Sequence, residues 1–203
     1  IWAVNHADGP VAVSQDTASL IETGLSLYRS TKGALNITLY PVVRAWGFTT
    51  GDYRVVPERE RQALLTRTDL SALILDAASG TVTVPEGMEL DLGSLGKGYT
   101  GDRIMEILRA HGITSAAISL GGNVHTLGAR PDGTPWRIAV QDPEQADSLA
   151  AILTVTDKAV ITSGGYERYF EENGQTYWHI MDPETGAPAD SGLISATVVG
   201  EQG

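Results

Sequence analysis

The chain has 203 residues, of which 14 are Lys or Arg and 25 are Asp or Glu, so its formal charge is −11 with neutral histidines. Such an acidic chain without a basic run is not expected to bind nucleic acid, because a polyanion requires clustered Lys or Arg. Hydrophobic residues make up 42% of the chain, enough for a sizeable core, and there are no cysteines. Disulfides, cysteine-based zinc sites and thiol nucleophiles are therefore excluded, and no run of 18 apolar residues predicts a membrane span.

Three segments have the hydrophobic spacing of amphipathic helices. The first ends before Gly33, a typical helix stop, and the second is opened by Pro57. Thr100 or Asp102 could cap the third, which ends at Gly112. The predicted helices cover residues 16–32, 58–65 and 103–110.

Strand-like segments surround these helices and are mostly joined by short turns. They cover residues 73–76, 81–84, 116–120, 136–140, 152–156, 176–180 and 194–199. Because strands outnumber helices, the pattern favours an α+β fold with a largely antiparallel sheet. No repeat, low-complexity tract or linker divides the sequence, so we expect a single domain over residues 1–203.

Residues 91–99 combine three glycines with Lys97, between a strand expected to end near Asp91 and the helix expected to begin near Asp102. Glycines let backbone N–H groups approach an anion, and Lys97 adds a positive charge. The segment is not a P-loop, because Gly98 stands where a magnesium-binding Ser or Thr should follow the lysine, and its glycine spacing does not fit a dinucleotide fingerprint. It is either an anion cradle or a tight strand-to-helix turn with an exposed lysine.

Two more glycine-rich turns follow predicted strands. Residues 120–123 read Leu-Gly-Gly-Asn, and residues 162–169 combine hydroxyl groups, two glycines and an arginine. Each allows a ligand to approach the backbone closely. Residues 120–123 more often form a bend or a bulge, and residues 162–169 equally suit a turn with an aromatic ring packed behind it.

Among the four histidines, His179 has the most suggestive setting. It ends a predicted strand and leads into residues 180–186, a turn that contains Asp182. An imidazole at a rigid strand end, with a carboxylate near enough to orient it or to hold a metal, suits proton removal from a hydroxyl nucleophile. The other three, His6, His111 and His125, are expected to be structural or exposed.

Five motifs, in their order and spacing, resemble those of the ApbE family, the FAD:protein FMN transferases. An upstream segment ending in Trp46-Gly47-Phe48 is also similar, and the resemblance covers roughly residues 20–199. The five motifs are residues 91–99 with Asp102, residues 120–123, residues 130–137, residues 163–169 and residues 179–186.

This resemblance implies a T-fold-like α+β architecture with packed helices. It also implies a magnesium-dependent enzyme that cleaves the pyrophosphate of FAD and releases AMP. The FMN would be attached through a phosphoester to a Thr or Ser hydroxyl of a target flavoprotein. A metal and a lysine would neutralise the developing phosphate charge.

The resemblance also assigns roles to residues of this sequence. Asp91 and Lys97 would contact FAD, and Ser94 would offer an oxygen, its carbonyl, to Mg²⁺. His179 would accept the proton of the acceptor hydroxyl. The flavin-nucleotide pocket would be lined by Trp46, Gly47, Phe48 and the backbone around Ile180 and Met181.

Some features depart from the family pattern. Family members usually continue into an Ala-Asp-Ala-Leu-x-Thr stretch whose Asp and Thr bind the metal, and an aromatic residue supplied before Ile1 stacks on the flavin. We therefore expect a domain truncated at both ends. Asn36 and Gly165 stand where acidic residues are common, and neither is expected to inactivate the protein.

Other functions agree with the same residues. Water could replace the protein hydroxyl, which would make the chain a FAD pyrophosphatase, or the chain could be a non-catalytic flavin-binding protein. A third interpretation is an α+β module without a ligand. Family habit implies the periplasmic side of a bacterial cytoplasmic membrane, reached through a lipid anchor outside this sequence, with the cytoplasm as the alternative.

Overall fold

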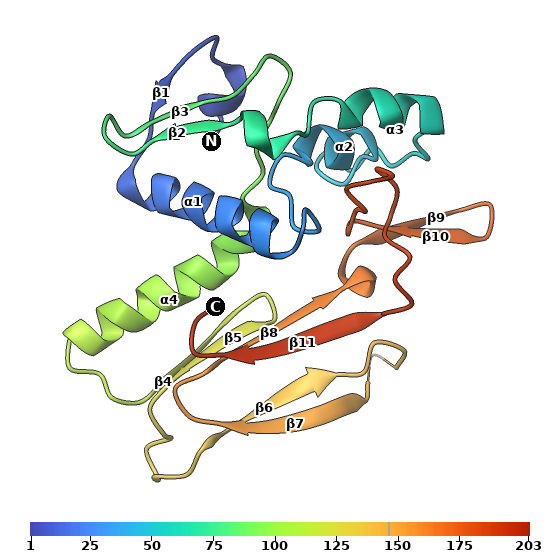
Figure 1. The fold of residues 1–203 in the computed structure, drawn as a ribbon. Coiled ribbons are helices and arrows are strands. Elements are labelled where there is room, and N and C mark those ends of the chain that lie inside the picture. The colour runs from blue at the N-terminus through green and yellow to red at the C-terminus, as the bar shows by residue number, and fades with distance from the viewer. Residues whose placement is uncertain (146) are drawn as a thin grey trace. The chain divides into compact units, whose positions relative to one another are not determined.

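Figure 1 shows the computed structural model of the chain, which describes residues 1–145 and 147–203. The chain forms two compact units, which are described separately. Unit 1 contains residues 1–94 and 167–191, and unit 2 contains residues 95–166 and 192–203.

Unit 1 combines helices with two small antiparallel sheets of order β1-β3-β2 and β10-β9. Its helical elements are η1 (Val4–His6), α1 (Gln15–Ser30), α2 (Tyr40–Ala45), α3 (Glu58–Leu65) and η2 (Leu70–Ala72). Its strands are β1 (Val11–Ala12), β2 (Ile74–Asp76), β3 (Thr81–Thr83), β9 (Tyr169–Glu172) and β10 (Gln175–Trp178).

Local signals explain the ends of the two predicted helices of unit 1. The Ser14 hydroxyl caps α1 by accepting a hydrogen bond from the Thr17 N–H at 3.2 Å. Beyond its last turn, Gly33 has a φ of +91° and donates its N–H to the Tyr28 carbonyl at 2.8 Å. Pro57 caps α3. Both predicted helices and the predicted β2–β3 hairpin are confirmed.

The β9–β10 hairpin turns at Asn173 and Gly174, whose φ angles are +53° and +77°. Two successive residues with positive φ are typical of a type I′ turn, which matches the twist of paired strands. The resulting register places Trp178 opposite Tyr169. Arg168 and His179, the next residues outward, are therefore brought together at the open end of the hairpin.

The core of unit 1 is built around Trp46, of which only 2% is exposed. Its indole Nε1 donates to the Gly186 carbonyl at 2.8 Å, so the ring is fixed by a hydrogen bond as well as by packing. The buried cluster consists of Leu39, Val42, Trp46, Phe48, Val56 and Met181.

Unit 2 is a four-stranded antiparallel sheet of order β11-β8-β5-β4, with a separate β6–β7 hairpin. Its strands are β4 (Ala116–Leu120), β5 (Asn123–Leu127), β6 (Trp136–Gln141), β7 (Leu149–Val155), β8 (Ala159–Gly164) and β11 (Ser195–Gly200). The short helix η3 (Gly165–Glu167) follows β8. The Gly121–Gly122 pair, with φ angles of +57° and +88°, is the β4–β5 turn, which favours the bend interpretation for this motif.

The third predicted helix begins ten residues earlier than expected. Helix α4 runs from Gly93 to Ala110, so the glycine-rich segment forms its first two turns and is not a loop. Asp91 caps this start, because its Oδ1 accepts the Gly93 N–H at 2.7 Å. Neither Thr100 nor Asp102 is a cap, and both lie inside the helix.

Other differences arise from weaker sequence signals. Helix α2 was not predicted, and it contains Pro41 in its first turn, where a missing N–H is tolerated. The strand expected to end near Asp91 is an isolated bridge between Leu39 and Glu89. All the named strands pair antiparallel, and the α+β fold class is confirmed. Within the described residues, no helix has the length and hydropathy needed to cross a bilayer.

Candidate functional site

His179 is held by a main-chain oxygen at the open end of the β9–β10 hairpin. Both its backbone N–H and its ring nitrogen Nδ1 lie 3.1 Å from the Arg168 carbonyl oxygen. A carbonyl oxygen only accepts hydrogen bonds, so Nδ1 carries a proton, and in the neutral imidazole the lone pair is then on Nε2. This is the tautomer that a general base requires at Nε2.

The Phe48 ring contacts this imidazole and belongs to a cluster of aromatic rings. The centroids of the Phe48 and His179 rings are 6.3 Å apart in an edge-on arrangement. Phe170 stacks on Tyr53 and on Tyr177, with centroid separations of 5.2 and 5.1 Å. The guanidinium of Arg168 donates to the Phe48 carbonyl at 3.4 Å, which ties the hairpin to the Trp-Gly-Phe segment.

The Trp-Gly-Phe segment is mostly a core element. The side chains of Trp46 and Phe48 are buried. Gly47 has a φ of +85°, and a Cβ there would lie 2.2 Å from the Asp52 carbonyl oxygen, so only glycine fits. The predicted contact of this segment with a flavin nucleotide stays a prediction, and the burial leaves the backbone as the part best suited to make it.

The turn after His179 is fixed by its own hydrogen bonds. The Ile180 carbonyl accepts the Ala189 N–H at 2.8 Å, and Met181 is buried in the core. The Asp182 carboxylate accepts the Glu184 N–H at 2.8 Å. The sequence assigned the orientation of His179 to Asp182, whereas the structure assigns the hold on Nδ1 to the Arg168 carbonyl, a main-chain group that no side-chain pattern reveals.

Asp91 and Ser94 lie at the start of α4, in unit 1. The Asp91 N–H donates to the Ile37 carbonyl at 2.8 Å. Asn5, which the sequence analysis missed, donates to the Leu90 carbonyl at 3.0 Å and accepts the Leu90 N–H at 2.8 Å. These bonds fix the backbone from which Asp91 and the first turn of the helix follow, and the unpaired N–H groups of a first turn favour an anion.

Lys97 lies in the second turn of α4, in unit 2. Its Nζ donates to the Gly121 carbonyl at 3.2 Å, so the β4–β5 turn and the helix are joined. The lysine is exposed, as the turn interpretation expected. The predicted contacts of Asp91 and Lys97 with FAD stay predictions.

Asn36 has a structural explanation in this chain. Its amide Nδ2 donates to the Thr68 carbonyl at 2.9 Å, and its Oδ1 accepts the Thr38 N–H and hydroxyl at 2.9 and 2.6 Å. A carboxylate could not make the first of these bonds. Gly165, the other departure, is buried in η3.

The magnesium prediction finds little support in the residues themselves. Among residues 1–145 and 147–203, no three His, Cys, Asp or Glu side chains come together in a way that could hold a metal ion. Mg²⁺ prefers six oxygen ligands in octahedral geometry, and Ser94 would supply one. Ser94 is therefore the one residue of this chain to which a role in binding Mg²⁺ is assigned, and that assignment stays a prediction.

Comparison with known proteins gives a consistent result. A model of the ApbE family matches residues 1–203. A FAD:protein FMN transferase of Klebsiella pneumoniae is 38% identical over 98% of this chain and 62% of its own length. The crystal structure of an ApbE protein from Thermotoga maritima has a TM-score of 0.93 and 33% identity, over 99% of this chain and 66% of its own.

A second solved structure, the flavin transferase ApbE of Vibrio cholerae, has a TM-score of 0.84 and 32% identity, over 99% of this chain and 64% of its own. The chain spans about three fifths of the length of the curated relatives that it matches.

Proposed function

This chain belongs to the ApbE family, and on that premise we propose that it is a FAD:protein FMN transferase. The reaction would cleave FAD, release AMP and attach FMN to a Thr or Ser hydroxyl of a target flavoprotein. The observation that carries this proposal is the hydrogen bond from His179 Nδ1 to the Arg168 carbonyl, because it leaves the lone pair on Nε2. The names of the relatives also support it.

In the proposed reaction, His179 Nε2 accepts the proton of the acceptor hydroxyl. The hydroxyl oxygen forms a bond to the phosphorus on the FMN side of the pyrophosphate, and the bond from that phosphorus to the bridging oxygen breaks. AMP leaves with the bridging oxygen and its electron pair. The ammonium of Lys97 and the first-turn N–H groups of α4 would offset negative charge on the phosphates.

The proposal includes a requirement for Mg²⁺, with the Ser94 carbonyl as one ligand. This part is supported by the family resemblance alone. We assign no catalytic step to the metal, because Ser94 is the single ligand that the resemblance assigns to this chain. A location on the periplasmic side of a bacterial cytoplasmic membrane, through a lipid anchor, is likewise proposed from the resemblance.

The discriminating experiment incubates the protein with FAD, Mg²⁺ and a target flavoprotein domain, with and without EDTA. Covalent flavin on the target supports transfer, and transfer that survives EDTA contradicts the magnesium requirement. Free FMN and AMP without covalent flavin would instead indicate a FAD pyrophosphatase. FAD bound but unchanged would indicate a non-catalytic flavin-binding protein, the second candidate.

His179→Ala tests the mechanism directly. We expect FAD binding to persist and the transfer rate to fall by about 10²–10⁴-fold, the usual contribution of a general base. His111→Ala is the matched control, because the His111 Nδ1 also bonds a main-chain carbonyl, that of Ile107 at 2.9 Å, at the end of α4. Loss of FAD binding together with transfer in His179→Ala would show that the residue is structural.

A further inference from the structure

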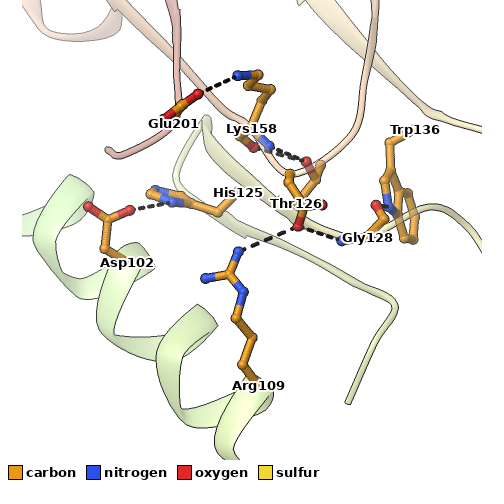
Figure 2. A network of polar contacts seen from close by, with 9 residues as sticks. Asp102, Arg109, His125, Thr126, Gly128, Trp136, Lys158 and Glu201 are labelled. Carbon is orange, nitrogen blue, oxygen red and sulfur yellow. Dashed lines mark hydrogen bonds and ion pairs between the residues drawn. The ribbon is translucent and has the colours of Figure 1, made fainter. Parts of the chain in front are cut away.

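A carboxylate on α4 joins three parts of unit 2. Asp102 Oδ1 lies 3.4 Å from Nδ1 of His125, a residue of β5 (Figure 2). The two carboxylate oxygens of Asp102 also accept the backbone N–H of Gly203, at 2.9 and 3.0 Å. The helix, the sheet and the residues that follow β11 therefore meet at one side chain.

Two glycines on one face of α4 allow His125 and Gly203 to lie close to the helix backbone. Gly98 and Gly101 are buried and one turn apart on α4, so they lie on the same face. A Cβ at Gly101 would lie 2.1 Å from His125 Nε2, and one at Gly98 would lie 2.4 Å from the carbonyl carbon of Gly203. Glycine is unfavourable inside a helix, and these two contacts explain its presence here.

His125 is more than a packing residue. Its side chain is 3% exposed, and its Nε2 is buried without a hydrogen-bond partner among the described residues. An apolar ring would fill the same space without leaving a buried polar atom unsatisfied. What the imidazole adds is Nδ1, which faces the Asp102 carboxylate and can donate its proton toward it.

The neighbouring residues hold the same region in place. Thr126, next to His125, accepts the Lys158 N–H at 3.0 Å and donates its hydroxyl to the Lys158 carbonyl at 2.9 Å. The Lys158 ammonium lies 3.4 Å from a carboxylate oxygen of Glu201, two residues before Gly203 (Figure 2). Two charged side chains therefore contact the residues that follow β11. Lys158 contacts the side chain of Glu201, and Asp102 binds the backbone of Gly203.

We propose that Asp102 and His125 are positioning residues for the FAD site. His125 orients the Asp102 carboxylate, and the carboxylate fastens the backbone at Gly203 to α4, one turn beyond Lys97. We call this contact of Asp102 with His125 and the Gly203 N–H the clasp. Because Lys97 and Gly101 are neighbours four residues apart on this helix, the clasp fixes the helix turn from which Lys97 reaches the Gly121 carbonyl. The FAD part of this inference rests on the proposed function.

The first test observes the clasp without any flavin. In the chain labelled with ¹⁵N-glycine, the Gly203 amide proton signal is expected to move upfield in Asp102→Ala, because a bond to a carboxylate is lost. Asp102→Asn, which keeps one acceptor oxygen, should give an intermediate position and serves if the alanine variant does not fold. An unchanged Gly203 signal in both variants would overturn the proposal.

The second test measures the FAD dissociation constant by calorimetry. Asp102→Ala and His125→Ala are expected to weaken FAD binding about tenfold, a typical effect of losing a supporting residue around a site. His125→Asn, whose amide can donate from the position of Nδ1, should restore most of the affinity, which a purely space-filling role would not predict. Glu106→Gln is the control, since Glu106 pairs with Arg103 on the exposed side of the same helix.

The outcomes separate this inference from the proposed function. Equal FAD affinity in Asp102→Ala and Glu106→Gln would overturn the positioning role even if the Gly203 signal moves. A wild-type chain that does not bind FAD would refute the proposed function, and the Gly203 signal would then decide the clasp by itself.

Discussion

Substituting Gly101 by alanine should destabilise the protein, although alanine is the better helix former. An added Cβ would lie 2.1 Å from His125 Nε2, roughly 1.4 Å inside an ordinary contact of about 3.5 Å. Overpacking of this kind costs about 1–3 kcal/mol, against a gain of about 1 kcal/mol in helix propensity. The expected net loss is therefore up to about 2 kcal/mol.

The sign should reverse when the ring is removed. In a His125→Ala background the Cβ has room, so Gly101→Ala is expected to stabilise by about 1 kcal/mol, and the coupling between the two sites is about 1–3 kcal/mol. Urea unfolding of the four proteins, with ΔG extrapolated linearly to water, measures this cycle.

Gly96→Ala provides the control on the same helix. Nothing lies within 4 Å of a Cβ at Gly96, so alanine there should stabilise by about 1 kcal/mol in both backgrounds. If Gly101→Ala stabilises the wild-type chain as much as Gly96→Ala does, the proposed contact between α4 and the His125 ring is refuted.

Three further predictions address other parts of the chain. Lys97→Ala should weaken FAD binding and leave the melting temperature unchanged, and normal affinity in a fluorescence titration would remove Lys97 from the site. Trp46→Phe should destabilise by about 1–3 kcal/mol, because the buried Gly186 carbonyl loses its donor; denaturant unfolding measures this, and a loss well below that range would contradict it. Hydrogen bonds from Thr134 hold the pKa of Asp132 below its ordinary value of 3.8. The ionised carboxylate therefore stabilises the fold above that pH and loses its effect as pH falls through the lowered pKa. Asp132→Asn should be less stable than wild type at pH 7 and converge with it in acid, and a difference independent of pH in thermal melts would argue against this.

Much of the fold follows from local patterns. Helices α1 and α3 and the β2–β3 hairpin were predictable because their caps, stops and hydrophobic spacing lie within a few residues of each other. The start of α4 was not, because glycines in a row suggest a loop. Contacts distant in sequence, such as that between Gly98 and Gly203, make them part of a helix.

The candidate site shows the same division. The setting of His179, directly after a strand and before a turn rich in Pro and Gly, was predictable, and its role stays a prediction. The group that orients the imidazole could not be predicted. It is a main-chain carbonyl, which every residue has, so the residue types do not reveal it. His125 was expected to be structural or exposed, and its burial depends on pairing between β5 and β8, which residue types alone do not reveal.

Because every amino acid has a carbonyl oxygen, the hold on His179 does not depend on which residue occupies position 168. Sequence divergence there would leave the protonation pattern of the imidazole intact, whereas one residue inserted at the Asn173–Gly174 turn would shift the alignment of the two strands and move that oxygen away. The tolerance of the His179 hydrogen bond to mutation is therefore set by the length of the hairpin rather than by its composition.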